Sequence, residues 1–406
     1  MKHDPRVLEA ALADLERQSL KRLRTTVESV GEPDSRLVTV SSGRRLVDFS
    51  SNDYLALSRH PALIAAMSDS ARRAGAGSGA SHLVTGHGIE HARLEEELAA
   101  FTGRERALLF STGYMANLAA VTSLAGRGEV VVLDRLSHAS LIDATLLSAA
   151  RFKRYTHADP AAADRALAAS SAEAAVVATD GVFSMDGDVA PLRDLARVSR
   201  AHRAWLLVDD AHGLGVMGET GRGSLEHFGL DDDDVPVLMG TLGKAFGSFG
   251  AFVAGSAELI EFLIQKARPY IYTTALPQPV AAATRAALRI VERESWRRER
   301  LLSLTERFRR AAAEEALPLI RSSTPIQPVL LGSTSAALTA QHLLAEAGFW
   351  VVAIRPPTVP RDSARLRITL SAAHTEPQVD ALVEALSRIW AGHRQERPPP
   401  RRIEAE

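Results

Sequence analysis

The sequence predicts an α/β protein with a large domain on a mainly parallel β-sheet and a smaller α+β domain after it. Between about residues 50 and 280, short β-rich apolar runs alternate with longer helical patterns. Such runs indicate strands buried on both faces of a parallel sheet, because helices cover both faces. Beyond about residue 280, one long helical stretch precedes three shorter strand-like runs, which is typical of a separate α+β unit.

The expected elements of the first two regions follow from hydrophobic periodicity. Apolar residues recur at helical spacing over about 4–24, which predicts an N-terminal amphipathic helix. The strands expected in the large sheet are "ALLF" (107–110), "EVVVL" (129–133), "AAVVAT" (174–179), "AWLLVDD" (204–210) and "VPVLMG" (235–240).

The last region opens with a helix expected at about 278–315. The strands expected after it are "IQPVLLG", "FWVVAI" and "ARLRITLSA", and a helix at 376–391 closes the domain. The polar, proline-rich end is predicted to be disordered. The predicted division is therefore an N-terminal helix and arm at 1–49, a large domain at 50–285, a small domain at 286–394 and a disordered tail at 395–406.

Composition excludes several classes of function. The chain has 406 residues, a formal net charge of −1 and 24% charged residues, so neither nucleic acid nor an anionic membrane is an expected partner. It has no cysteine, which excludes disulfides and thiolate metal sites, and no metal is expected. The start is charged throughout and no apolar run is long enough to span a membrane, so a cytoplasmic location is expected.

Polar and small residues follow the predicted strands, where ligands bind in open α/β sheets. After "ALLF", a small-residue turn opens a helix, and free amides near Gly113 and Tyr114 would suit an anion such as phosphate. His138 and Ser184 follow two further strands. Taken singly, an ordinary strand-to-helix turn explains Gly113 and Tyr114 better than an anion site does, and capping or a surface position explains His138 better than a functional role. Turn formation explains Ser184 equally well.

The combination with a buried lysine is more specific. "DDAHGLGVMGETGRG" places Asp209, Asp210 and His212 at a strand end, and Lys244 lies among glycines in "GTLGKAFGSFGAF". Pyridoxal phosphate (PLP) needs a lysine to bind its aldehyde and a carboxylate to keep its ring nitrogen protonated. The pattern alone does not choose between Asp209 and Asp210. Burial and nearby positive charge are expected to lower the pKa of Lys244.

These motifs resemble those of the α-oxoamine synthases, PLP enzymes with the aspartate-aminotransferase fold (fold type I). The resemblance covers about residues 4–391. The motifs that carry it are "DFSSNDYLALS" (48–58), "GSGASHLVTGHGIEHARLEEELA" (77–99), "DRLSHASLIDA" (134–144), "TDGVFSMDGDVAPL" (179–192), "VDDAHGLGVMGETGRG" (208–223), "TLGKAFGSFGA" (241–251) and "AIRPPTVPRDSARLRITLSAAH" (353–374).

The resemblance implies a role for each cofactor residue. Lys244 would bind PLP covalently and move protons at the substrate α-carbon, and Asp209, rather than Asp210, would pair with the ring nitrogen. His138 would stack on the ring and touch the substrate. The remaining cofactor residues implied are Ser184 and His212 near the ring hydroxyl, and Gly113, Tyr114 and Thr241 at the phosphate.

The resemblance also implies substrate and subunit contacts. Asn52, Thr358 and Arg367 would handle the amino-acid carboxylate and the acyl substrate. Arg22 would meet the acyl chain, although Arg24 could take its place. Thr273 and Thr274, in "IYTTALP", would reach the phosphate of a neighbouring subunit, which implies a homodimer with shared active sites.

Within the family, "IRPPTVP" before "ARLR" favours a member that condenses L-alanine with a pimeloyl thioester to make a biotin precursor. Carbon dioxide and the free thiol would be released, and the thiol would belong to coenzyme A (CoA) or a carrier protein. Two alternatives stay open. One is a glycine-using relative such as 2-amino-3-oxobutyrate CoA ligase or 5-aminolevulinate synthase. The other is a non-catalytic partner subunit, which the presence of Lys244, Asp209 and His138 disfavours.

Overall fold

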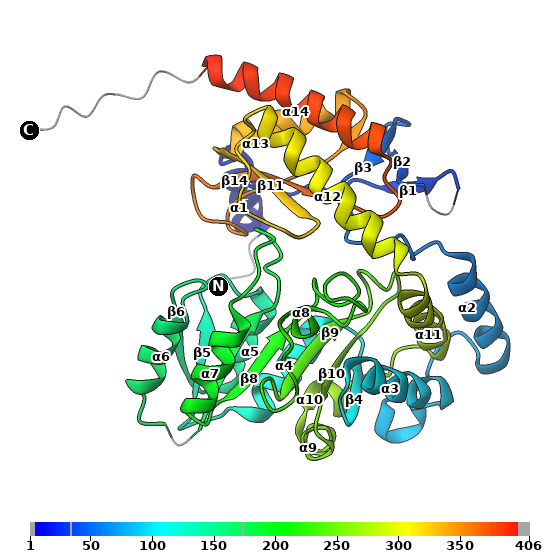
Figure 1. Cartoon of the computed structure of the whole chain (residues 1–406), viewed down its shortest axis with the longest axis vertical. Helices are drawn as coiled ribbons and strands as arrows, with labels where there is room; N and C mark the ends of the chain where they lie inside the picture. Colours follow the sequence, from blue (N-terminus) through cyan, green and yellow to red (C-terminus); the bar gives the residue numbers. More distant parts are fainter. Residues whose placement is uncertain (1–4, 33–34, 173, 397–406) are drawn as a thin grey trace, which may run out of the picture. The chain divides into compact units, whose positions relative to one another are not determined.

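The computed structural model describes residues 5–32, 35–172 and 174–396 of the chain. Two compact units are present: Asn52–Leu301 forms one, and the described residues before Asn52 form the other together with those from Leu302 onward. In Figure 1 the first unit runs from blue-cyan to yellow-green, and the second combines the dark blue start with the yellow-to-red end. The predicted domain boundaries after residues 49 and 285 remain predictions.

The unit formed by Asn52–Leu301 is built on a seven-stranded sheet of order β4-β10-β9-β8-β7-β5-β6. Strand β10 is antiparallel to its neighbours β4 and β9, and the other pairs are parallel. The predicted mainly parallel sheet is thereby confirmed. The strands are β4 (Arg106–Phe110), β5 (Val130–Asp134), β6 (Arg151–Tyr155), β7 (Ala175–Asp180), β8 (Trp205–Asp209), β9 (Val237–Thr241) and β10 (Ala251–Gly255).

Alternate residues of β5, β7, β8 and β9 supply two separate cores, one on each face of the sheet. Val131 and Leu133 of β5 belong to the core that α4, α5, α9 and α10 cover, whereas Val130 and Val132 belong to the core under α6, α7 and α8. Successive side chains of a strand point to opposite faces of the sheet. A strand without polar residues therefore requires helices that cover both faces. The continuous apolar runs of the sequence follow from this burial.

Helices and one short π-helix complete this unit (Figure 1). They are α2 (Pro61–Ala74), η1 (His82–Gly86), α3 (Ile89–Thr102), α4 (Gly113–Leu124), α5 (Ala139–Ser148), α6 (Pro160–Ala168), α7 (Leu192–Ala201), α8 (Ser224–Phe228), α9 (Ala257–Lys266), α10 (Arg268–Ile271) and α11 (Gln278–Arg293). The helix expected at 278–315 is divided, because the backbone leaves helical geometry at Glu294 (φ −109°, ψ 64°) before α12 (Trp296–Glu314) begins.

The second unit contains two small sheets. One has the order β1-β2-β3-β12 and the other β11-β14-β13. The elements are α1 (Pro5–Arg17), β1 (Val27–Val30), β2 (Leu37–Val40), β3 (Arg45–Asp48), β11 (Ile326–Gly332), α13 (Thr334–Glu346), β12 (Phe349–Trp350), β13 (Val352–Ile354), β14 (Ala364–Thr369) and α14 (Glu376–Glu396). The predicted strand "FWVVAI" is thus two strands in different sheets.

The two ends of the second unit differ in part from expectation. The N-terminal helix ends at Arg17 rather than near residue 24, and α14 runs to Glu396. The disordered tail predicted from residue 395 lies, from residue 397 onward, outside the described residues. Among the helices described, none combines the length and apolar character of a membrane span.

Candidate active site

A cavity of about 220 Å³ lies at the carboxyl ends of the strands in the large sheet. Its walls come from segments that follow β4, β5, β7, β8 and β9, the edge where ligands bind in open α/β sheets. Several residues singled out in the sequence meet here although they are distant along the chain. These lining residues are Gly113, Tyr114, His138, Asp209, His212, Thr241 and Lys244.

The carboxylate of Asp209 is held in one orientation by hydrogen bonds. Its Oδ2 accepts from Asn117 Nδ2 at 2.7 Å, and its Oδ1 accepts from the amide of Ala211 at 3.0 Å. Asn117 also donates to Ser140 Oγ at 2.8 Å, and Ser140 Oγ lies 2.7 Å from His138 Nδ1. A buried network of this kind fixes its members relative to one another.

A second buried acid, Asp180, stands beside Asp209 across the β7–β8 ladder. Burial, and after it the negative charge of Asp209, raises the pKa of Asp180 well above its ordinary value. Asp180 Oδ2 accepts from the backbone amide of His138 at 3.0 Å. Asp180 therefore supports the backbone of His138 at the edge of the cavity.

Asp210, the neighbour of Asp209 in sequence, has a different environment and does not line the cavity within the described part of the chain. Its Oδ2 accepts from the amide of Ser224 at 2.7 Å, and burial raises its pKa to about 7. A Cβ on Gly213 or Gly223 would lie 2.1 or 2.0 Å from this carboxylate. The glycines after the two acids therefore make room for Asp210.

His138 is both a helix cap and a wall of the cavity. It is the N-cap of α5, where its Nδ1 accepts from the amide of Ser140 at 3.2 Å. Burial lowers the pKa of His138; the charge of Asp209 opposes this and that of Lys244 adds to it. Because Nδ1 accepts, the neutral ring carries its proton on Nε2. A neutral, fixed imidazole ring can pack flat against an aromatic ligand.

The N-terminus of α4 offers free amides at Gly113 and Tyr114. Thr112 caps this helix by accepting from the amide of Met115 at 3.2 Å, and a Cβ on Gly113 would lie 2.8 Å from Thr241 Cγ2. The helix start therefore packs directly on the side chain of Thr241, whose hydroxyl donates to the carbonyl oxygen of Ala211 at 3.3 Å and which lines the same cavity as Gly113 and Tyr114. Such an arrangement binds phosphate groups.

These groups fit PLP. A lysine, a buried carboxylate, a flat imidazole and an amide cradle share one cavity of about 220 Å³, below the ~300–1,000 Å³ of pockets for drug-sized ligands and suited to a single substituted ring. Tyr114 contributes its amide, while its hydroxyl donates to Asp143. PLP chemistry uses a lysine at the cofactor's aldehyde and a charged partner at its ring nitrogen, and Lys244 and Asp209 are of these types.

Other predicted residues of the same unit do not line the cavity among the residues described: Ser184, Asn52, Thr273 and Thr274. Asn52 Oδ1 is buried without a hydrogen-bond partner among the described residues. Nearby in the chain, Tyr54 Oη lies 2.7 Å from His212 Nδ1 and holds that ring. Thr273 and Thr274 border a small hollow with His82 and Tyr270.

The second unit has its own cavity of about 590 Å³, lined in part by Arg22, Thr358 and Arg355. Arg22 Nη2 donates to Thr358 Oγ1 at 3.3 Å. Burial, and after it the charge of Arg22, lowers the pKa of Arg355, so two guanidinium groups stand close together. Among the described residues, Arg24 and Arg367 do not line this cavity.

Arg367 lies instead inside the antiparallel sheet of the second unit. It is a buried residue of β14, and its Nη1 donates to Thr369 Oγ1 at 2.9 Å.

Sequence reasoning missed the supporting residues Asn117, Ser140 and Asp180. Asp180 closes the run "AAVVATD" and could have been found as the last residue of a strand. Asn117 lies one helical turn after Gly113, a position where a polar residue in an apolar helix indicates a buried partner. Ser140 had no such signal.

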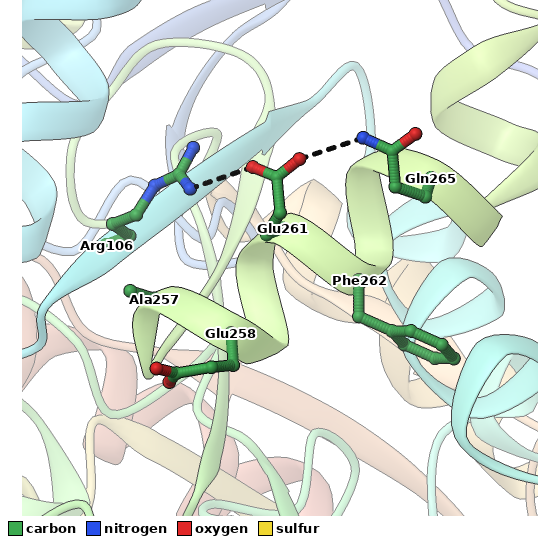
Figure 2. Close-up of a pocket in the computed structure, with 6 residues that line it drawn as sticks. All are labelled: Arg106, Ala257, Glu258, Glu261, Phe262 and Gln265. Atoms are coloured by element: carbon green, nitrogen blue, oxygen red, sulfur yellow. Dashed lines mark hydrogen bonds and ion pairs between the residues drawn. The ribbon is translucent and has the colours of Figure 1, made fainter.

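A hollow of about 480 Å³ between β4 and α9 can be set aside (Figure 2). Glu261 accepts from Arg106 at 3.1 Å and from Gln265 at 2.8 Å, while Glu258 and Phe262 point away from that pair. The groups are exposed and paired with one another, which is the usual state of a solvated surface.

Comparison with known proteins gives consistent results. The family described as aminotransferase class I and II matches residues 44–386. A relative from Methylococcus capsulatus, named 8-amino-7-oxononanoate synthase, is 60% identical over 93% of this chain and 97% of its own. A relative of the same name from Cellvibrio japonicus is 57% identical over 95% of this chain and 96% of its own.

Solved structures agree with the sequence relatives. A serine palmitoyltransferase (SPT) from Sphingomonas wittichii has a TM-score of 0.89 and 31% identity, covering 97% of this chain and 98% of its own. An SPT structure with PLP as an internal aldimine has a TM-score of 0.89 and 30% identity, over 95% and 97% of the two chains. An 8-amino-7-oxononanoate synthase from Francisella tularensis has a TM-score of 0.76 and 32% identity, over 86% and 99%.

Proposed function

Because the chain belongs to the aminotransferase class I and II family, and within it to the 8-amino-7-oxononanoate synthases, we propose that it catalyses their reaction. L-Alanine condenses with a pimeloyl thioester, carbon dioxide and the free thiol leave, and 8-amino-7-oxononanoate is formed for biotin biosynthesis. The observation that carries this proposal is the shared cavity of Lys244, Asp209 and His138 in a chain 60% identical to a synthase.

PLP is the cofactor of this family, and the cavity residues would hold it. When bound, it supplies an electron sink for the charge left on the substrate α-carbon. Lys244 would hold its aldehyde carbon, Asp209 its ring nitrogen, and the α4 amides with Thr241 its phosphate. The hydrogen bond from Asn117 to Asp209, at 2.7 Å, supports a fixed carboxylate facing the ring.

Proton movement would fall to Lys244. Its amine, freed when alanine enters, would take the α-proton and later return one to the product carbon. His138, fixed as the cap of α5 with Nδ1 engaged, would cover the ring face and exclude water. Lys244 would thus act as the base at the substrate α-carbon, and His138 would shield that carbon from water.

The acyl substrate has a distal carboxylate, which Arg22 would recognise. Arg22 and Thr358 are hydrogen-bonded and line one cavity, and a guanidinium binds a carboxylate through charge-assisted hydrogen bonds. Arg367 and Asn52 remain proposed contacts of the amino-acid carboxylate and the acyl group. Ser184 and His212 remain proposed contacts near the ring hydroxyl.

Purified protein assayed with alanine or glycine against pimeloyl, acetyl and succinyl thioesters tests the proposal. We expect alanine with the pimeloyl thioester to give the highest kcat/KM, with CoA and carrier-protein thioesters compared side by side. A pocket for one methyl group discriminates by roughly 1–3 kcal/mol, so glycine should react weakly. Better turnover of glycine with acetyl or succinyl thioester would instead assign a glycine-using activity.

We also infer a homodimer with shared active sites. The side chains of Leu83, Val84 and Ile89 are exposed in and beside η1, and exposed apolar groups of this kind mark protein interfaces. The backbone of η1 is tied to the segment of Thr273 and Thr274 through the bridge between Ser81 and Thr274. This segment is the one proposed to reach the partner's phosphate.

Complementation tests the dimer. Lys244→Ala and a Thr273→Ala/Thr274→Val double variant should each be inactive and regain part of the activity when mixed and reassociated, because one hybrid site is intact. Full activity of a monomer at high dilution would show that the active site does not need residues of a partner subunit. The expected cytoplasmic location stays a prediction.

A further inference from the structure

Three histidines outside the proposed PLP cavity gather around η1. His82 lies in η1, His87 directly follows it, and His91 is in the first turn of α3. Their candidate ligand nitrogens all lie within 4.8 Å of one another. We propose that His82, His87 and His91 form a binding site for one divalent transition-metal ion of the class that prefers imidazole, with Zn²⁺ as the reference ion.

Two of the rings lie close enough for one ion to reach both. His82 Nδ1 and His87 Nδ1 are 2.9 Å apart, and zinc–nitrogen bonds are about 2.0–2.1 Å long, so one ion would reach both at close to a right angle. Without an ion, one shared proton holds this contact. The side chain of His87 is 31% exposed, so its ring has room to adjust to an ion.

His91 has the tautomer that a ligand needs. Its Nε2 lies 2.6 Å from the carbonyl oxygen of Leu276 and therefore carries the proton, which leaves the lone pair on Nδ1. Metal-binding histidines commonly donate their second nitrogen to a backbone carbonyl in this way. Nδ1 now accepts from the amide of Gly88 at 3.0 Å, a bond that the ion would replace.

An acid stands behind the second ring. Glu95 Oε2 lies 3.8 Å from His87 Nε2, on the side of the ring opposite to His82, and carboxylates often orient metal-binding histidines from this position. Burial lowers the pKa of His82 to about 3 and also lowers those of His87 and His91.

The site would clamp two segments of the chain. Ala275 N donates to Ala80 O at 3.0 Å, and the ring of His82 stacks on Tyr270 at 4.9 Å. Thr273 and Thr274 lie in the chain segment between Tyr270 and Ala275. An ion bound at the three histidines would fix η1 against α3 beside this segment, so binding should raise the thermal stability of the enzyme.

The sequence contains a signal for this site that the cysteine count does not reveal. His87, His91 and Glu95 are spaced by four residues. His91 and Glu95 lie in α3, whereas His82 and His87 come from η1 and the residue directly after it. The absence of cysteine excludes thiolate ligands only.

Equilibrium dialysis of the PLP-loaded enzyme against ZnCl₂, after treatment with EDTA, tests the proposal. The variants are His87→Ala, which changes a partly exposed ring, and His82→Gln. The control is His342→Ala, because His342 is exposed on α13, where it lies 3.3 Å from Glu346 of the same helix. Thermal melting with and without Zn²⁺ gives a second readout that does not depend on catalysis.

We expect about one Zn²⁺ per chain in the wild type and in His342→Ala, with a rise in Tm. His87→Ala should weaken binding about tenfold or more, since even outer partners of a ligand contribute about 10- to 100-fold. Equal binding by His87→Ala and the wild type, or no binding by the wild type, would overturn the proposal. Should His82→Gln fail to fold, His87→Ala decides alone.

Discussion

The two cavities described above differ in how far their charged groups are buried. The cavity at the sheet edge has about 220 Å³ and lies among buried, hydrogen-bonded groups such as Asp209 and Asp180. The cavity of the second unit has about 590 Å³, and the exposed side chain of Arg22 forms part of its wall. This contrast fits the roles proposed above, namely charge changes at fixed positions in the first cavity and recognition of a long substrate in the second.

The difference has an energetic reason. Preorganised groups in a water-excluded site stabilise developing charge without having to reorient, so their loss should affect turnover. Exposed charges interact through a high dielectric and are screened by salt, so their loss should affect substrate binding. The comparison thus predicts which kinetic constant each substitution changes.

The largest effect is expected for Lys244→Ala. Turnover should fall to the detection limit, because covalent cofactor binding and proton transfer are lost together. Borohydride reduction of the wild type should fix the yellow chromophore on the peptide that contains Lys244. Lys266→Ala, at the end of α9, is the control; a label on Lys266 would contradict the assignment.

Asp209→Asn should come next. The change removes the charge that faces the ring nitrogen but keeps the shape, so kcat should fall by about three powers of ten, each corresponding to about 1.4 kcal/mol of transition-state stabilisation. The phosphate contacts, and hence PLP content, should change little. Asp210→Asn is the matched control, with a mainly structural effect; the reverse result would show that the wrong acid has been chosen.

A smaller effect is expected in the exposed cavity. Arg22→Ala should raise the KM for the pimeloyl thioester about tenfold or more, since hydrogen bonds to charged groups contribute about 1.5–3 kcal/mol. The KM for alanine should stay nearly constant, and the effect should shrink at high salt. Arg24→Ala is the control. An equal effect of both variants on alanine would remove the contrast between the cavities.

The smallest effect concerns stability beside the large sheet. Burial opposes the charge of His157, but hydrogen bonds with Asp134 and Asp188 outweigh it and raise the pKa of His157 to about 9. A raised pKa means that this stabilisation is complete below about pH 6.5 and is lost as the pH rises through about 9. Each tenfold gain in proton affinity on folding corresponds to about 1.4 kcal/mol of stability.

Urea unfolding of the wild type at pH 6 and pH 9.5, compared with His157→Gln, measures this contribution. The difference between the two proteins should be largest at pH 6. A difference that is constant with pH would mean that His157 contributes through packing alone.

Most of the large sheet could be predicted, because fully buried strands leave continuous apolar runs. Strand β6, "RFKRY", escapes prediction because it is an edge strand with charged residues. Strand β10 escapes it because "AFVAG" belongs to the glycine-rich motif around Lys244. The sequence predicts one helix over 278–315, because the apolar periodicity continues across the break at Glu294.

The sequence by itself determined that a lysine, acids, a histidine and an anion-binding helix start would follow neighbouring strands. The residue pattern left Asp209 and Asp210 equivalent, and only the family resemblance chose Asp209. The sequence did not reveal the link from Asp209 through Asn117 and Ser140 to His138. Successive side chains at a strand end point in opposite directions. Only the packing of β8 between β7 and β9, with helices on both faces, decided that Asp209 faces the cavity while Asp210 bonds to Ser224.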